Sequence, residues 1–242
     1  MIKIQNLTCA FGQKTVLENL TQTIPSHLSI LGANGSGKST LAKALCGINS
    51  YGGSIKIGNK NLQEYEPKER AKTIAYIPTK LEFYDEYLTL EEFVLLGRFP
   101  HKESFLDYSQ EDRAIASRKM ELLKITHLKR HLLNTLSSGE SALALIAQAL
   151  TQESEIIIFD EPTANLDPKN AKIVAGHIKN LKQTHQTILI THDISLAHFM
   201  NNPVLFLKDK NATLFEQNDF FTDENLSHCY DVPFESLELC YA

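Results

Sequence analysis

The 242-residue sequence has no apolar run near the roughly 20 residues that a membrane-spanning helix needs. The first six residues also lack the apolar stretch of a secretory signal. We therefore expect any work at a membrane to go through a partner protein.

Positive charge and paired cysteines are also scarce. The 24 Lys and Arg residues are outnumbered by 29 Asp and Glu. The basic face typical of nucleic-acid-binding proteins is not evident, which argues against nucleic acid as a partner. The four cysteines, Cys9, Cys46, Cys229 and Cys240, form no C-x-x-C pair and no zinc-finger spacing. We expect reduced thiols in a cytosolic protein.

What is present is an alternation of short apolar runs and helical segments, typical of an α/β protein with a largely parallel sheet. The expected strands are Ile2–Leu7, Val16–Ile24, Leu28–Leu31, Ser54–Ile57, Thr73–Ile77, Glu155–Asp160 and Thr187–Thr191, with a hairpin of Val204–Leu207 and Ala212–Phe215. The expected helices are Thr40–Cys46, Leu90–Leu96, Asp112–Ile125, Ser137–Leu150 and Lys169–Lys182. Residues 81–150 are read as a helical subdomain inserted between residues 1–80 and 151–242 of a single domain.

The segment from Gly32 to Thr40 matches the phosphate-loop pattern G-x-x-x-x-G-K-[ST] in full, between a strand and a helix. Its glycines let backbone N–H groups turn inward around phosphates. Lys38 is expected to meet the β- and γ-phosphates, and Ser39 to offer a hydroxyl to Mg²⁺. The residues predicted to bind the triphosphate are Asn34, Gly35, Ser36, Gly37, Lys38, Ser39 and Thr40. The pattern predicts a P-loop NTPase core, and the simpler alternative is a glycine-rich turn. We expect the core to contain a mixed, mostly parallel sheet with an N-terminal antiparallel β part.

Two acids follow an apolar strand at Asp160 and Glu161, and Pro162 ends that strand. Beside a phosphate loop, Asp160 is predicted to hold Mg²⁺. Glu161 is predicted to deprotonate the attacking water. The alternative is a solvated acidic turn.

The segment from Leu136 to Glu140 reads L-S-S-G-E and begins a helix, with Ser137 and Glu140 spaced as a capping box. It resembles the L-S-G-G-[EQ] signature of ABC transporter ATP-binding subunits. That resemblance implies that Ser137 and Gly139 meet the γ-phosphate of ATP held by a second subunit. Two chains would then enclose two ATP molecules head to tail.

Other positions extend the resemblance. Ala164–Asp167 resembles the D-loop at the dimer interface. His192 resembles the switch histidine that contacts the γ-phosphate, whereas His127 and His131 are read as structural or solvated. Phe11 occupies the place of the aromatic residue that stacks on adenine, with core packing as the alternative.

The chain departs from the family pattern at three places. Thr79 stands where the family usually has a glutamine that reaches Mg²⁺, and the threonine hydroxyl is shorter than that amide side chain. Ser138 replaces a glycine of the signature, and residues 141–143 read Ser-Ala-Leu where Arg-Gln is common. We predict weaker turnover or weaker coupling than in a typical relative.

Two further segments of the sequence point to a class of transported cargo. The segments Leu96–His101 and Asn225–Pro233 resemble those of importers for iron chelates, haem and cobalamin. The resemblance implies a homodimer at the cytoplasmic face of the inner membrane, bound to a permease and, through it, to a substrate-binding protein. A groove for a permease helix is predicted at Phe83, Tyr84, Tyr87 and Leu88, with core packing as the alternative.

Three other interpretations of the sequence are possible besides a metal-chelate importer. One is an ABC ATPase that serves another cargo or direction. The others are a soluble ABC-type ATPase acting on DNA or ribosomes and a slowed regulatory nucleotide-binding module. Such soluble ATPases usually carry coiled-coil insertions or tandem halves, and neither is evident in this sequence. Lys38, Asp160, Glu161 and His192 argue against a purely regulatory module.

Overall fold

The computed structural model describes residues 1–80, 86–102 and 107–234, and the side chain of Phe11 is not among them. The chain divides into two compact units. The first contains residues 1–65, 158–161 and 186–242, and the second contains residues 66–157 and 162–185. Among the described residues, no helix is long and apolar enough to cross a membrane.

The first unit begins with an antiparallel sheet in the order β2-β1-β4-β5. Its strands are β1 (Ile2–Phe11), β2 (Lys14–Ile24), β4 (Gly52–Ile57) and β5 (Lys60–Asn61). Apolar and polar residues alternate along β1, so that Ile2 and Ile4 are buried while Lys3 and Gln5 are exposed. This period of two gives the sheet one core face and one solvent face.

The other strands of this unit follow the order β10-β9-β3-β8-β7. They are β3 (His27–Gly32), β7 (Ile156–Asp160, which spans the division of the chain), β8 (Gln186–Ile190), β9 (Val204–Lys208) and β10 (Asn211–Phe215). Strand β3 pairs in parallel with β8 and β9, and β10 pairs antiparallel with β9. Strand β7 is buried throughout, as expected for a strand covered on both faces. The carboxyl end of β3 leads into the phosphate loop.

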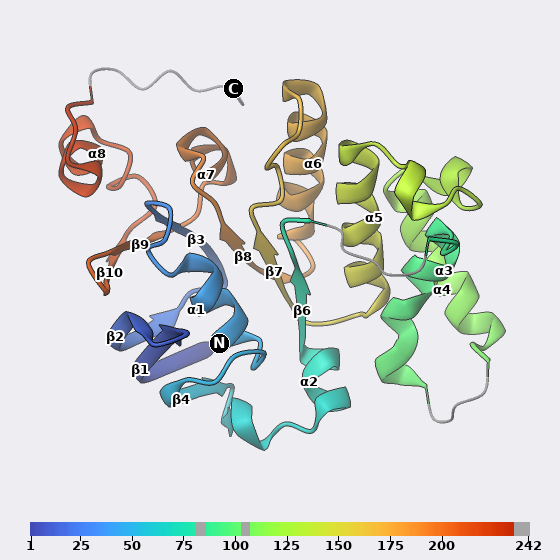
Figure 1. The fold of residues 1–242 in the computed structure, drawn as a ribbon, viewed down its shortest axis with the longest axis horizontal. Helices are drawn as coiled ribbons and strands as arrows, with labels where there is room; N and C mark the ends of the chain where they lie inside the picture. The colour runs from blue at the N-terminus through green and yellow to red at the C-terminus, as the bar shows by residue number, and fades with distance from the viewer. Residues whose placement is uncertain (81–85, 103–106, 235–242) are drawn as a thin grey trace. The chain divides into compact units, whose positions relative to one another are not determined.

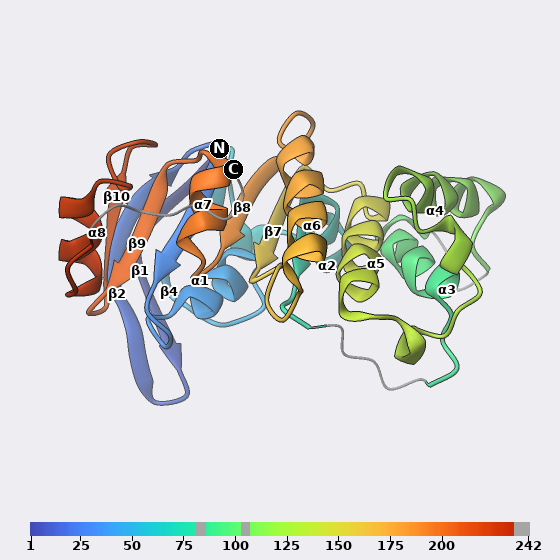
Figure 2. The same ribbon diagram turned by 90° about the horizontal axis from the view of Figure 1, so that it is seen from above.

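The described part of the first unit also contains the helices α1 (Lys38–Leu45), α7 (Ile194–Met200) and α8 (Asp223–Tyr230), with a short 3₁₀ turn at Leu62–Glu64 (Figure 1). Helix α1 packs against β1 and β3, and α7 packs against β3. Helix α8 covers β9 through an apolar cluster that includes Phe206, Phe220 and Leu226 (Figure 2).

The second unit is mostly helical. It contains α2 (Pro67–Thr73), β6 (Ile74–Ile77), α3 (Leu90–Leu95), the 3₁₀ helix η2 (Leu96–His101), α4 (Gln110–Leu122), α5 (Ser138–Thr151) and α6 (Pro168–Leu181), with 3₁₀ turns at Thr126–Leu128 and Leu133–Thr135. Helix α5 packs against α3, α4, α6 and β6. It is therefore the central element of this unit.

Local sequence signals account for most of these helix starts. Helices α3, α4 and α5 each begin with a complete capping box, formed by Thr89 with Glu92, Ser109 with Asp112, and Ser137 with Glu140. Pro67 and Pro168 occupy the first turns of α2 and α6, where a missing N–H costs nothing. The capping box predicted at Ser137 is confirmed.

The α/β fold class with an antiparallel N-terminal sheet is confirmed, whereas some element bounds differ from the prediction. Thr73 ends α2 instead of opening a strand, because the polar segment before β6 forms a helix that begins at Pro67. Helices α7 and α8 were not predicted, because both are short and owe their burial to tertiary packing. Residues 81–150, predicted as a helical subdomain, belong to the second unit together with α2, β6 and α6 wherever they are described.

Candidate active site

The phosphate loop joins β3 to α1 with a backbone that requires glycine. Gly35 and Gly37 have positive φ angles of 82° and 100°, a region that other residues rarely adopt. Gly32 has no room for a side chain, because a Cβ there would overlap the carbonyl oxygen of Leu207 and lie 2.7 Å from the Ser36 hydroxyl. The loop therefore delivers the chain to the N-terminus of α1, where backbone N–H groups can meet an anion.

Lys38 is the buried cation of this loop. Its Nζ donates hydrogen bonds to the carbonyl oxygens of Gly32, at 2.9 Å, and Ala33, at 3.1 Å. Burial lowers the pKa of the Lys38 ammonium, and the negative charges of Glu161 and Asp160 oppose that shift. The phosphate loop and the two acids therefore act electrostatically on one another inside the first unit.

Asp160 and Ser39 meet although they are 121 residues apart in sequence. The Ser39 hydroxyl donates a hydrogen bond of 3.1 Å to Oδ1 of Asp160, which is buried at the end of β7. A hydroxyl and a carboxylate are hard oxygen donors of the kind that Mg²⁺ prefers, and Mg²⁺ commonly takes its other ligands from water and phosphate. These two residues fit a magnesium ion. The described residues hold no cluster of three or more His, Cys, Asp or Glu that would form an all-protein metal site.

Glu161 and His192 form a second pair beside the phosphate loop. Glu161 has a positive φ of 52°, and its N–H donates to the carbonyl of Ile190 at 2.9 Å. This turn directs the carboxylate toward His192, whose backbone N–H lies 3.3 Å and whose Nδ1 lies 2.9 Å from Oε2 of Glu161. The Glu161 side chain is 15% exposed and the His192 side chain is 58% exposed. A carboxylate held by an exposed imidazole is suited to accept a proton from a bound water.

The L-S-S-G-E segment belongs to the second unit, at the N-terminus of α5. The Ser137 side chain accepts a hydrogen bond from the N–H of Glu140, and the carboxylate of Glu140 accepts from the Ser137 N–H at 2.8 Å and from its hydroxyl at 2.7 Å. Ser137 and Ser138 are exposed. Helix α5 therefore presents a capped N-terminus with hydroxyl groups, an arrangement that suits an anion.

Gly139 is buried against α6. A Cβ at Gly139 would lie 2.7 Å from the side chain of Asn170, so only glycine lets this contact stay so close. Asn170 in turn donates a hydrogen bond of 2.5 Å to Asp167, the N-cap of α6. This contact was not predicted. The Asp-x-x-Asn spacing at the start of α6 was the only available signal for it.

Residues 17–164 match the sequence profile of the family described as ABC transporter. A match over more than half of the chain decides the family.

The chain belongs to the ABC transporter family. It is an ATP-binding and ATP-hydrolysing subunit of that family, which agrees with the phosphate loop, the acid pair and the signature segment described above. A protein of Helicobacter pylori named a probable iron chelatin transport ATP-binding protein is 34% identical over 98% of this chain and 95% of its own length. The ferric enterobactin transport ATP-binding protein FepC of Escherichia coli is 36% identical over 67% of this chain and 61% of its own length.

Solved structures agree with this ABC assignment. A metal-chelate type ABC transporter in an inward-facing conformation matches with a TM-score of 0.84 and 28% identity, covering 96% of this chain and 89% of that one. A dimeric ATP-binding cassette bound to ADP and Pi in a post-hydrolysis state matches with a TM-score of 0.77 and 26% identity, covering 91% and 100%.

The remaining predicted positions of this ABC subunit lie as follows. Asn34 is exposed and Thr40 is half-buried, both around the phosphate loop. Phe11 ends β1, but its side chain lies outside the described residues. Thr79 is exposed just beyond β6, in the second unit. Adenine stacking by Phe11 and metal contact by Thr79 stay predictions.

Proposed function

We propose that this subunit powers uptake of an iron chelate or a chemically related metal complex through a separate membrane permease. The supporting observation is the likeness to a named iron chelatin transport subunit along 98% of the chain. The ferric enterobactin relative and the metal-chelate type transporter structure point to the same class of cargo. A substrate-binding protein would deliver the cargo to the permease.

Two copies of the chain are proposed to enclose two ATP molecules head to tail. Ser137 and Gly139 would contact the γ-phosphate held by the phosphate loop of the partner copy. The exposure of Ser137 at a capped helix N-terminus supports this assignment. The dimeric cassette bound to ADP and Pi provides a precedent at 26% identity.

The proposed reaction is in-line attack of water on the γ-phosphorus. Glu161 accepts a proton from the water while the water oxygen bonds to phosphorus. His192 orients the Glu161 carboxylate. The bond between the γ-phosphorus and the bridging oxygen breaks, and ADP leaves with the bonding electron pair. Lys38 stabilises charge on the phosphate oxygens. Mg²⁺, held by Ser39 and Asp160, would neutralise charge on the β- and γ-phosphates when bound.

The permease is proposed to contact the second unit near Tyr87. The Tyr87 side chain is 82% exposed, whereas a large aromatic side chain that serves core packing would be buried. Aromatic residues are enriched at protein–protein interfaces, so this exposure suits a contact with the permease. Phe83 and Tyr84 lie outside the described residues, and Leu88 is half-buried. Such a contact would place the subunit at the cytoplasmic face of the inner membrane.

Co-purification tests the permease contact. Tyr87→Glu should release the subunit from its permease while ATP binding by the first unit is retained. Leu122→Glu is the matched control, because Leu122 is also a largely exposed apolar side chain of the second unit. A complex that survives Tyr87→Glu would remove this assignment. A subunit that never co-purifies with any permease would favour a soluble ABC-type ATPase.

Uptake measurements test the cargo. A strain lacking this chain should lose uptake of a radiolabelled iron chelate, haem or cobalamin. The wild-type chain should restore that uptake, and the Glu161→Gln variant should not. Radiolabelled manganese is the comparison cargo, because a manganese transport subunit of Halalkalibacterium halodurans is 29% identical over 95% of this chain. Loss of manganese uptake alone would replace the proposed cargo class.

A further inference from the structure

The segment Leu96–His101, which forms the 3₁₀ helix η2, lies against the last turn of the signature helix α5. Gly97 allows this approach: a Cβ there would overlap the carbonyl oxygen of Gln148 and lie 3.1 Å from the N–H nitrogen of Gln152. The backbone of η2 therefore packs directly on the backbone of α5, at the end opposite Ser137.

Arg98 holds this contact in place from inside. Its side chain is buried, and its Nε donates to Asp112 of α4 at 2.8 Å. Its Nη1 donates to the carbonyl of Thr151 at 3.1 Å and to the carboxylate of Glu153 at 2.6 Å. One guanidinium thus joins η2, α4 and the C-terminal end of α5.

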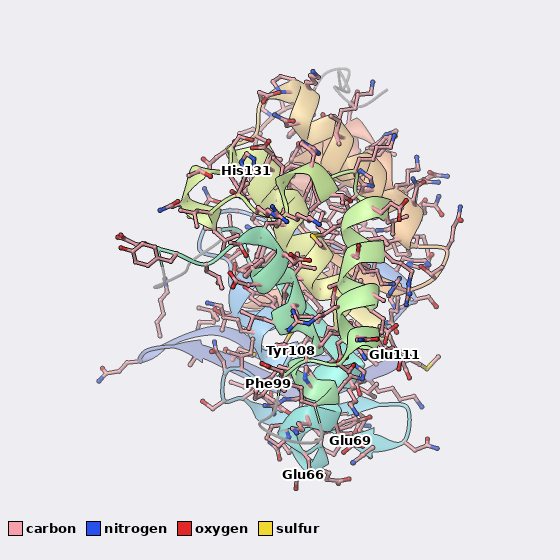
Figure 3. The ribbon with its side chains drawn as sticks, turned by 90° about the vertical axis from the view of Figure 1, so that its right-hand side faces the viewer. Glu66, Glu69, Phe99, Tyr108, Glu111 and His131 are labelled. Atoms are coloured by element: carbon pink, nitrogen blue, oxygen red, sulfur yellow. The ribbon has the colours of Figure 1, made fainter. Side chains whose placement is uncertain are left out.

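Gln152 extends the same contact to β6. Its side-chain amide donates to the carbonyl of Ala71, in α2, and to the carbonyl of Ile74 at 3.0 Å, where β6 begins. Its own carbonyl accepts from Nε2 of His101, with the two atoms 2.9 Å apart. Figure 3 labels Phe99, Glu111 and Glu69, exposed residues that lie one or two positions along the chain from Arg98, Asp112 and Ala71. We call Arg98 and Gln152 the clamp.

The clamp lies about 20 Å from Ser137, since α5 has 14 residues with a rise of about 1.5 Å each. A helix is stiff over this length, so fixing its C-terminal end also fixes the direction of its N-terminal end. Strand β6, which receives the Gln152 amide, leads through Pro78 to Thr79.

We propose that Gln152 and Arg98 are positioning residues for ATP hydrolysis. They hold the far end of α5 on β6 and η2, and so keep Ser137 and Gly139 in register with the strand that leads to Thr79. This inference rests on the proposed role of the signature residues. It assigns a mechanical task to the Leu96–His101 segment, which the reaction itself leaves unexplained.

Substitutions at Gln152 test the proposal in the purified ATPase. Gln152→Glu keeps the shape but turns a donor toward two carbonyls into an acceptor, and we expect kcat to fall about tenfold with KM for ATP changed less than about twofold. Gln152→Lys can still donate to both carbonyls and should recover most of the rate. Gln148→Glu is the control, because Gln148 lies one turn earlier on α5 and is half-buried like Gln152. If Gln152→Glu does not fold, Gln152→Ala takes its place.

A double-mutant cycle separates positioning from general destabilisation. If Gln152 acts through the signature, its substitution should cost little further activity in a Ser137→Ala background. Additive losses, or an unchanged kcat in Gln152→Glu, would overturn the proposal. If Ser137→Ala alone leaves ATPase activity unchanged, the proposed role of the signature fails instead. Thermal melting of each variant shows that the measured losses belong to folded protein.

Discussion

The Oε2 atom of Glu161 lies 2.9 Å from Nδ1 of His192, although the two residues are 31 positions apart in sequence. The positive φ of Glu161 directs its carboxylate to this contact. A base that is held in one orientation before the reaction needs no reorganisation during proton transfer. Glu161 and His192 are therefore the pair that we propose for proton transfer in ATP hydrolysis.

Glu161→Gln should abolish hydrolysis and retain ATP. Glutamine keeps the size of the side chain but cannot accept the proton, so we expect kcat to fall by about 100-fold or more. The variant should also accumulate as an ATP-bound dimer in size-exclusion chromatography. Glu155→Gln is the control, because Glu155 is exposed just before the same strand. Normal hydrolysis by Glu161→Gln would remove the assignment of the base.

His192→Ala should lower kcat about tenfold to 100-fold with a small change in KM for ATP, because it frees the Glu161 carboxylate without touching the phosphate loop. Steady-state ATPase kinetics measure both constants. His228→Ala, a change at an exposed histidine of α8, should behave like wild type. A rise in KM alone would show that His192 serves nucleotide binding instead of orientation of the base.

Thr79→Gln should raise the ATPase rate and change its Mg²⁺ dependence. The longer amide side chain of glutamine can reach Mg²⁺ where the threonine hydroxyl is too short. We expect the ATPase rate to rise about threefold to tenfold. Activity measured across a Mg²⁺ titration gives both effects. An unchanged rate with an unchanged Mg²⁺ midpoint would refute the link between Thr79 and the metal.

Ser137→Ala should lower both stability and ATPase activity, whereas Thr89→Ala should lower stability alone. Each substitution removes the N-cap of a complete capping box, at a cost of about 1 kcal/mol in the free energy of unfolding. Urea unfolding and ATPase assays on the two variants separate the cap from the phosphate contact. Equal ATPase losses in both variants would mean that Ser137 acts only as a helix cap.

Asp112→Asn should destabilise the protein by about 2 kcal/mol near neutral pH, because the buried guanidinium of Arg98 loses one of its two carboxylate partners and keeps only Glu153. Burial opposes ionisation of Asp112, but hydrogen bonds from Arg98 and Ser109 outweigh it and lower the pKa of this carboxyl. The stabilisation is therefore full above the ordinary pKa of 3.8 and is lost as pH falls through the lower folded value.

Melting curves of wild type and Asp112→Asn between neutral pH and pH about 3 check this sign. The difference in melting temperature should stay constant down to a pH of about 5 and shrink below about 4. A difference that grew in acid would contradict the lowered pKa of Asp112. Glu121→Gln, at an exposed carboxylate of the same helix α4, should leave the pH dependence of the melting temperature in acid unchanged.

Local sequence determined the phosphate loop and the helix cap at Ser137, because each depends on a few consecutive residues. The phosphate loop from Gly32 to Thr40 needs glycines at set φ angles, and Ser137 with Glu140 completes a cap within four residues. Both follow from backbone chemistry that neighbouring residues decide, so the loop, the cap and the α/β class were predictable. The order of the motifs along the chain also indicated the family.

Only the tertiary structure decided which distant residues meet. Ser39 reaches Asp160 across 121 positions, and Gly97 lies on the backbone of α5 because their elements pack together. Nothing in the sequence indicates that Arg98 donates hydrogen bonds to Asp112, Thr151 and Glu153. A single arginine in a sequence is equally compatible with a solvated surface. Such contacts depend on the summed packing of whole helices and strands, which no local pattern encodes.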